Sequence, residues 1–176
     1  MVTTQYVPNQ DAGMISIAPG LDLWREVNVH AMDYKGYDID VCVIADGHKL
    51  VAQEVRVTRR PDGPPVTSEA LRTVAVAAFV RHSIQASSDP AWKPSSTRVA
   101  FGLMDVAHRD RMREAGPTTE TLEWVARVYS CALAAGDKPA KAVQDAFEVP
   151  RYTAGRWVAS ARKRGFLGPA EPGKAG

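Results

Sequence analysis

The 176-residue chain has only two cysteines, Cys42 and Cys131, and neither belongs to a C-x-x-C pair. Because they lie far apart in the sequence, we expect reduced, buried thiols rather than a disulfide or a zinc site. The chain also lacks any run of about 18 apolar residues. Its first residues, MVTTQYVPNQ, do not have the basic-then-apolar order of a signal peptide. These absences predict a cytoplasmic protein that makes no contact with a membrane.

Motifs for catalysis are missing as well. No Ser-His-Asp order, glycine-rich phosphate loop or paired-carboxylate motif stands out in the sequence. One histidine and three aspartates do cluster around a predicted turn, namely His30, Asp33, Asp38 and Asp40. Their spacing matches no known ligand set, which favours solvent-facing turn residues over a metal or nuclease site. We therefore predict a protein that is not an enzyme and uses no metal or cofactor.

Acidic residues are absent from the stretch 150–165, which holds five Lys or Arg. The net charge of the whole chain is only +2, but its distribution is uneven. Residues 1–105 carry 10 basic and 12 acidic side chains, whereas residues 106–167 carry 11 basic and 7 acidic ones. A local excess of cations is the electrostatic footprint expected of a surface that binds nucleic acid.

The stretch 139–167, PAKAVQDAFEVPRYTAGRWVASARKRGFL, predicts two helices joined by a short turn. Pro139 suits the first turn of a helix, and Pro150 marks a break because it disfavours helix at the residue before it. The first helix has one apolar face, made of Val143, Ala146 and Phe147. The second has apolar residues at i, i+3, i+4 and i+7, which form a single buried stripe of Ala154, Trp157, Val158 and Ala161.

The side of the second helix opposite this stripe is predicted to face solvent or a ligand. It carries Tyr152 and Arg156 near the helix start, and Gly155 removes a side chain where a close approach is useful. An α-helix fits the major groove of B-DNA, where Arg can bond guanine edges and flanking cations can pair with phosphates. The predicted DNA-binding residues are Lys138, Lys141, Arg151, Tyr152, Thr153, Arg156, Arg162, Lys163 and Arg164.

This segment resembles the helix-turn-helix domains common in actinobacterial and phage proteins, and the resemblance covers about a third of the chain. It departs from their usual pattern at three positions. Gln144 stands where a small residue is usual, Glu148 where Gly is usual, and Pro150 where a Ser or Thr cap is usual. A left-handed conformation costs a non-glycine residue such as Glu148 roughly 1 kcal/mol, so a wider turn is expected.

Residues 24–59 predict an antiparallel meander of three strands, at 24–34, 37–45 and 49–59. Apolar and polar residues alternate along each of them, with Val51, Val55 and Val57 placed on one face of the third. Lys35-Gly36 and Asp46-Gly47 supply the turns. A helix over 69–85, capped by Thr67 or Ser68, is expected to cover the apolar face.

The end of the third strand carries a basic group of residues, Arg56, Thr58, Arg59 and Arg60. Three-stranded sheets can lay a face on DNA, so an auxiliary DNA contact is one interpretation. Acidic residues on the same face, including Asp38 and Glu54, would repel phosphate. A solvated edge is therefore the favoured interpretation.

Together these patterns predict an α+β fold, with an N-terminal three-stranded antiparallel sheet and a helix, followed by an all-α trihelical helix-turn-helix domain. The expected boundaries are a flexible tail at 1–12, an α+β domain with its loop at 13–98, a connecting helix at 99–116, the helix-turn-helix domain at 117–168, and a second flexible tail at 169–176.

The predicted function is sequence-specific binding of double-stranded DNA through a basic recognition helix, as a transcriptional regulator. The N-terminal domain then supplies homodimerisation, a contact with another partner, or ligand sensing, and the sequence does not decide among them. One alternative is a structural or assembly protein, for example of a phage, whose trihelical domain packs against protein or handles DNA without regulation. Another is an accessory DNA-binding subunit of a recombination system.

Overall fold

The structure is a computed structural model that describes residues 3–87 and 104–168. The chain divides into two compact units. The first consists of Met1–Ile15 and Leu23–Ser88, and the second of Ser16–Asp22 and Asp89–Gly176.

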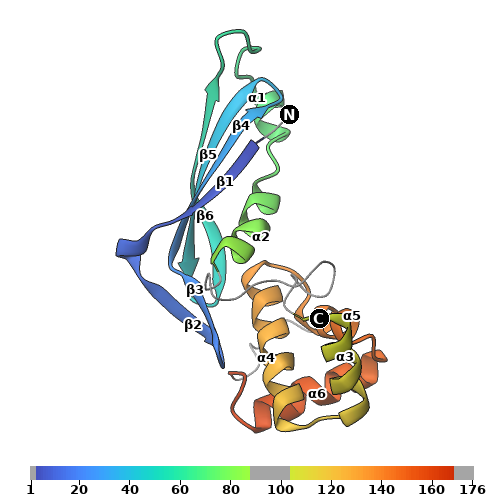
Figure 1. Cartoon of the computed structure of the whole chain (residues 1–176). Helices are drawn as coiled ribbons and strands as arrows, with labels where there is room; N and C mark the ends of the chain where they lie inside the picture. The colour runs from blue at the N-terminus through green and yellow to red at the C-terminus, as the bar shows by residue number, and fades with distance from the viewer. Residues whose placement is uncertain (1–2, 88–103, 169–176) are drawn as a thin grey trace. The chain divides into compact units, whose positions relative to one another are not determined.

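The first unit is built on a four-stranded antiparallel sheet in the order β1-β4-β5-β6 (Figure 1). Its strands are β1 (Thr3–Pro8), β4 (Glu26–Tyr34), β5 (Tyr37–Asp46) and β6 (Lys49–Arg59). A separate two-stranded sheet pairs β2 (Met14–Ala18) with β3 (Leu21–Trp24), and a short 3-10 helix, η1 (Gln10–Ala12), precedes it. The meander of β4, β5 and β6 lies where the sequence pattern placed it.

The predicted fold class was wrong about the sheets. The structure has a four-stranded sheet and a second, two-stranded sheet, not a three-stranded sheet followed by an all-α domain. The fourth strand, β1, falls in the segment expected to be a loose tail. The side chains of β1 on the core side of the sheet are those of Thr4, Tyr6 and Pro8. Two of them are polar and the third is a proline. The strand was not predicted because its sequence therefore shows no alternation of apolar and polar residues. The strands β2 and β3, of five and four residues, were not predicted either.

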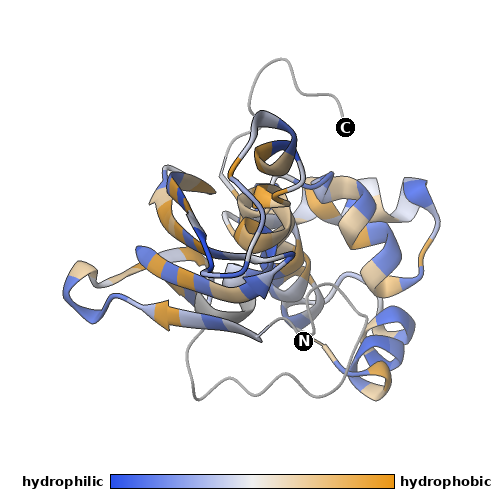
Figure 2. Cartoon of the chain, turned by 90° about the horizontal axis from the view of Figure 1, so that it is seen from above, coloured by the Kyte–Doolittle hydropathy of each residue, from blue (hydrophilic) through white to orange (hydrophobic). Residues whose placement is uncertain are grey.

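Alternation along the central strands sets the core of the first unit. Val27, Val29 and Ala31 of β4 are buried, as are Ile39 and the other apolar residues of β5 that share their face. Figure 2 shows hydrophilic and hydrophobic residues alternating along the strands. Each side chain of an antiparallel pair points to the same side as the one opposite it, so this pattern fixes the register of the sheet.

One detail of β6 differs from the prediction. Glu54 pairs with Cys42, but Ala52 pairs with Val43, so Gln53 is an extra residue in a β-bulge. The bulge reverses the alternation, and Val51 consequently lies on the face opposite Val55 and Val57. Leu50 takes the buried position instead. Val51, Val55 and Val57 are spaced by even numbers of positions in the sequence, so their spacing does not reveal the bulge.

The helix expected over 69–85 is two helices, α1 (Ser68–Arg72) and α2 (Val76–Ser87). Thr67 caps the first, accepting a hydrogen bond of 3.2 Å from the amide of Ala70. The helix α2 packs against all four strands of the larger sheet, where Phe79, Val80 and Ile84 are buried. It therefore covers the apolar face, as predicted, whereas Leu71 of α1 remains 50% exposed.

The second unit contains α3 (Val106–Ala115), α4 (Thr119–Ala134), α5 (Pro139–Phe147) and α6 (Arg151–Lys163). It is not purely helical, because Ser16–Asp22 of the β2–β3 hairpin belongs to it, and the Nε of Arg127 donates a 2.7 Å hydrogen bond to the carbonyl of Pro19. Its helical part is also not trihelical. Met112 of α3 is buried in the same core as α4, α5 and α6, so α3 is part of the bundle rather than a connector.

Several predicted segments lie outside the described residues. These are the start of the connecting helix at 99–103, most of the loop at 86–98, and the tail at 169–176. Among the described residues, no helix is both long enough and apolar enough to cross a membrane.

Candidate nucleic-acid interface

The core under the candidate interface is made by α4, α5 and α6. The predicted stripe of α6, Ala154, Trp157, Val158 and Ala161, is buried, and so is the predicted apolar face of α5. The rings of Phe147 and Trp157 meet edge to face, with centroids 5.4 Å apart and an interplanar angle of 88°. This geometry places the negative face of one ring against the positive edge of the other. The prediction of two helices packed through these residues is confirmed.

The helices α4, α5 and α6 all end in the same hydrogen-bonding pattern, the Schellman motif. In this motif the residue after the C-cap takes a left-handed conformation, and the next amide bonds back to a carbonyl five residues earlier. Gly136 after α4 and Gly165 after α6 take this position with φ values of 74° and 77°. After α5 the position is taken by Glu148, with φ 50° and ψ 44°, and the amide of Val149 bonds to the carbonyl of Gln144 at 3.2 Å. The turn is therefore of the usual width, and Glu148 takes the strained conformation.

The carboxylate of Glu148 compensates for this strain through two arginines of α3. Arg109 donates a hydrogen bond to one oxygen of Glu148, and Arg113 lies 3.6 Å from the other. The side chain of Arg109 is only 11% exposed, and it also bonds Asp110 at 3.0 Å. The side chain of Glu148, by contrast, is 56% exposed, so the pair lies at the edge of the solvent. The turn between α5 and α6 is thus tied to a helix that sequence reasoning had left outside the bundle.

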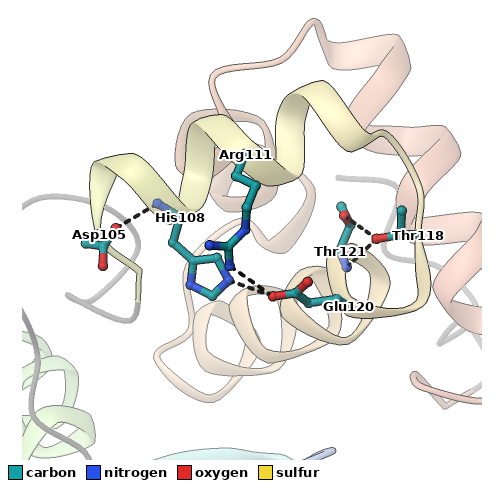
Figure 3. A network of polar contacts seen from close by, with 6 residues as sticks. All are labelled: Asp105, His108, Arg111, Thr118, Glu120 and Thr121. Carbon is teal, nitrogen blue, oxygen red and sulfur yellow. Dashed lines mark hydrogen bonds and ion pairs between the residues drawn. The ribbon is translucent and has the colours of Figure 1, made fainter.

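A second polar link joins α3 to α4 (Figure 3). The carboxylate of Glu120 accepts from His108 at 3.0 Å and from Arg111 at 3.3 Å. The pKa of Glu120 is lowered, above all by the hydrogen bond from His108. At the start of α4, the hydroxyl of Thr118 accepts a hydrogen bond of 3.2 Å from the amide of Thr121 and so caps the helix. Together with Glu148, this link holds α3 against the helices that carry the candidate interface.

The exposed side of α6 has a distinct surface near its N-terminus. Tyr152 is 76% exposed, and the guanidinium of Arg156 lies 5.8 Å from the centroid of its ring. A shallow depression on this surface is lined by Arg151, Tyr152, Gly155 and Arg156. A Cβ built on Gly155 meets no atom of the described residues within 4 Å. The predicted outer face is therefore present, and these four residues form it; we call it the α6 face.

Arg162, Arg164 and Lys141, all predicted to bind DNA, form hydrogen bonds with other side chains of the protein. Arg162 donates a 2.7 Å hydrogen bond to the hydroxyl of Tyr129, and its guanidinium lies 5.0 Å from the Tyr129 ring. Arg164 donates to Thr119 at 3.0 Å, and Lys141 pairs with Asp145 at 2.8 Å. The side chain of Arg162 is half-buried, with its guanidinium held by Tyr129 of α4. Sequence spacing placed it on the flank of α6, and only the position of Tyr129 reveals the partner.

The remaining predicted residues lie outside the α6 face. Lys163 is exposed on the last turn of α6, Thr153 is half-buried on the first turn, and Lys138 is exposed at the N-cap of α5. Of the nine predicted residues, the structure therefore brings Arg151, Tyr152 and Arg156 together at one depression. Gly155 lies beside them. The signal for it in the sequence was a glycine within the second predicted helix, on the side opposite the apolar stripe.

The cluster of His30, Asp33, Asp38 and Asp40, weighed in the sequence as a metal or nuclease site, forms hydrogen bonds within the first unit. Nδ1 of His30 lies 2.7 Å from Asp40 across the strands β4 and β5, while Asp38 accepts from the amide of Asp33 and from Arg60, each at 3.0 Å. Asp33 lies within an irregularity of the β4–β5 pairing and has a φ of 59°. Within residues 3–87 and 104–168, no group of three or more His, Cys, Asp or Glu is arranged to hold a metal.

The basic group at the end of β6 is likewise held by neighbours. Arg56 bonds Glu54 at 2.9 Å, Arg59 bonds the carbonyl of Gly63 at 2.7 Å, and Arg60 pairs with Asp38. These contacts neutralise two of the three cations and fix the third to the following loop. The arrangement favours a solvated edge over an auxiliary DNA contact.

Sequence reasoning did not assign a role to Arg109 and Arg113. The available signal was Glu148 itself, because an acidic residue at a position that favours glycine needs a compensating partner.

Comparisons with protein-family models, with curated proteins and with solved structures find no significant match for this chain.

Proposed function

We propose that the second unit binds double-stranded DNA in a sequence-specific manner, with the α6 face in the major groove, and that the protein acts as a transcriptional regulator. A helix of the length of α6 fits this groove, and a planar guanidinium near its start can bond the edge of a guanine. Arg156 and Arg151 are exposed at that end, and Tyr152 offers an apolar ring for contact with a thymine methyl group.

Gly155 carries most of this proposal. A glycine inside a helix costs roughly 1 kcal/mol relative to alanine, yet a Cβ at this position would meet open space in the described structure. The packing of the protein therefore gives no reason for a glycine here. A partner that approaches the helix backbone closely does give one, and the walls of a DNA groove are such a partner.

The electrostatics of the surroundings support an anionic partner. The helix α6 carries no acidic residue. Two acidic side chains that precede it are neutralised within the unit, Asp145 by Lys141 and Glu148 by Arg109 and Arg113. Pairing of these carboxylates leaves the positive charges of α6 dominant at its surface, which lowers the free energy of bringing phosphates close.

The first experiment is a selection of bound sequences from random duplexes, which identifies a target site if one exists. We then compare two variants on the selected site and on random DNA. Arg156→Ala should lower the affinity for the selected site by about 1 to 3 kcal/mol and relax the preference at one or two base pairs. Lys163→Ala should weaken both DNAs alike and reduce the slope of log affinity against log salt by about one unit.

Gly155→Ala separates the role of this residue in binding from its role in folding. This change should raise the stability of the unit by up to about 1 kcal/mol while weakening DNA binding. If Arg156→Ala weakens specific and random DNA by the same factor, α6 does not read sequence, and an assembly protein or a recombination accessory protein becomes the better interpretation. If neither DNA binds, the unit docks on protein.

A further inference from the structure

The strand β6 forms one edge of the four-stranded sheet. It is 11 residues long, and among the described residues only β5 pairs with it. An edge strand presents unpaired N–H and C=O groups, and proteins usually protect long edges with proline, with inward-pointing charges or with bulges. β6 contains no proline, and its bulge lies at Gln53. Beyond the bulge, residues 54–59 pair with β5 without interruption, so this part of the edge is regular.

The centre of this regular edge carries an apolar side chain on the side of the sheet that holds the core. Val55 pairs with the buried Val41, yet it is 40% exposed. Val55 lies on the edge strand, so a strand that continued the sheet past β6 would bury more of its side chain.

The residues on either side of Val55 carry opposite charges on the other face of the sheet. Glu54 pairs with Cys42 and Arg56 with Asp40, so both side chains point away from the core. They bond each other at 2.9 Å, with 59% and 68% of the respective side chains exposed. Read in either direction, the triplet Glu-Val-Arg has an acid at one end, a base at the other and an apolar residue between them.

We propose that the β6 edges of two copies of this chain pair in an antiparallel manner about a two-fold axis through Val55. Residues opposite each other in such a pair lie on the same face. This register sets Glu54 of each copy opposite Arg56 of the other and brings the two Val55 side chains together. A two-fold axis through Arg56 instead sets two arginines opposite each other, and one through Glu54 sets two glutamates opposite each other. Charge complementarity therefore selects a second copy as the partner and Val55 as the centre.

The interface is isologous, as expected for a closed dimer, and it joins two four-stranded sheets into one continuous sheet. Strand pairing at one edge buries less area than a standard protein interface, so the dimer is concentration-dependent. This inference does not rest on DNA binding, because every residue in it belongs to the first unit.

The test uses the full chain and its charge-reversed variants, measured by sedimentation across a wide range of concentrations. Glu54→Arg and Arg56→Glu each place like charges opposite each other at both ends of the triplet. Each variant should raise the dissociation constant of the dimer by about tenfold or more. Mixing the two variants should restore dimers, now as heterodimers, because every pair across the interface again has opposite charges.

Two controls separate dimerisation from folding. The double variant Glu54→Arg/Arg56→Glu reverses the triplet but stays self-complementary, so it should dimerise like the unchanged protein. Asp22→Arg makes the same change of charge at an exposed site on β3 and should leave the dissociation constant unchanged. A protein that stays monomeric at the highest concentration overturns the proposal. So do single variants that dimerise normally, or a mixture of the two that yields no heterodimer.

Discussion

Glu148 and Arg109 are 39 positions apart in the sequence, yet a hydrogen bond joins the carboxylate of the first to the guanidinium of the second. Glu148 occupies the left-handed position of the turn between α5 and α6, where the other two Schellman turns of the bundle have glycine. The contact explains how an unfavourable residue is accommodated at this turn. The side chain gains an ion pair with α3, and the backbone carries the strain.

Two substitutions separate these contributions. Glu148→Ala and Glu148→Gly both remove the carboxylate, but only the glycine relieves the positive φ. The alanine variant should therefore be less stable than the glycine variant by about 1 kcal/mol in chemical denaturation. Equal stabilities, or a more stable alanine variant, would mean that the turn has rearranged.

Trp157 should be the most sensitive position in the core of the second unit. It is 6% exposed and stacks edge to face on Phe147, which is fully buried. Trp157→Ala should lower the free energy of unfolding by roughly 3 to 5 kcal/mol, because removing the indole ring leaves a cavity in the packed core. Tyr152→Ala on the same helix is the matched control, and it should change stability by no more than about 0.5 kcal/mol since the ring is exposed. An unchanged thermal midpoint for Trp157→Ala would refute the core assignment.

The stability of the first unit should depend on the protonation of Asp38. The pKa of Asp38 is lowered, first by the hydrogen bond from the amide of Asp33 and then by Arg60. Because the folded pKa lies below the unfolded one, the stabilisation is complete above about pH 4 and is lost as the pH falls through the lowered folded pKa. Asp38→Asn should therefore show a shallower decline of the thermal midpoint below pH 4 than the unchanged protein.

Arg60→Gln is the graded control for this pH dependence. It removes the ion pair but keeps the amide bond of Asp33, so its pH profile should lie between those of the unchanged protein and Asp38→Asn. Identical acid profiles for all three proteins would show that Asp38 does not contribute to folding through its charge.

The two thiols should differ sharply in reactivity. Burial raises the pKa of Cys131 to about 12, so almost none of it is thiolate at neutral pH. Cys42 is only half-buried on the sheet, and its pKa is raised by this burial and by the charges of Glu26 and Glu54. A thiol reagent should label Cys42 slowly in the folded protein and label Cys131 only through unfolding, at a rate that increases with denaturant. The Cys42→Ser variant should then show no labelling under native conditions, and rapid labelling of Cys131 would contradict its burial.

The sequence by itself determined the elements with a strong period. The alternation of valine and polar residues specified β4, β5 and β6, and the i, i+3, i+4 and i+7 spacing specified the buried stripe of α6 around Trp157. The proline signal specified the break at Pro150. These features depend on neighbours within a few residues, and such local information is present in the sequence as written.

Only the tertiary structure decided the rest, because the deciding partners lie far away along the chain. The edge strand β1 forms by pairing with β4 and shows no apolar alternation of its own. The bulge at Gln53 changes which valines face the core without changing their spacing. α3 became part of the bundle through Met112 and through the bonds of Arg109 and Arg113 to Glu148. Likewise, the hydrogen bond from Arg162 to the hydroxyl of Tyr129, 33 positions earlier, depends on how α4 packs against α6 and does not follow from spacing along α6. The spacing of residues on a helix gives the direction of a side chain, and only the fold shows what it meets there.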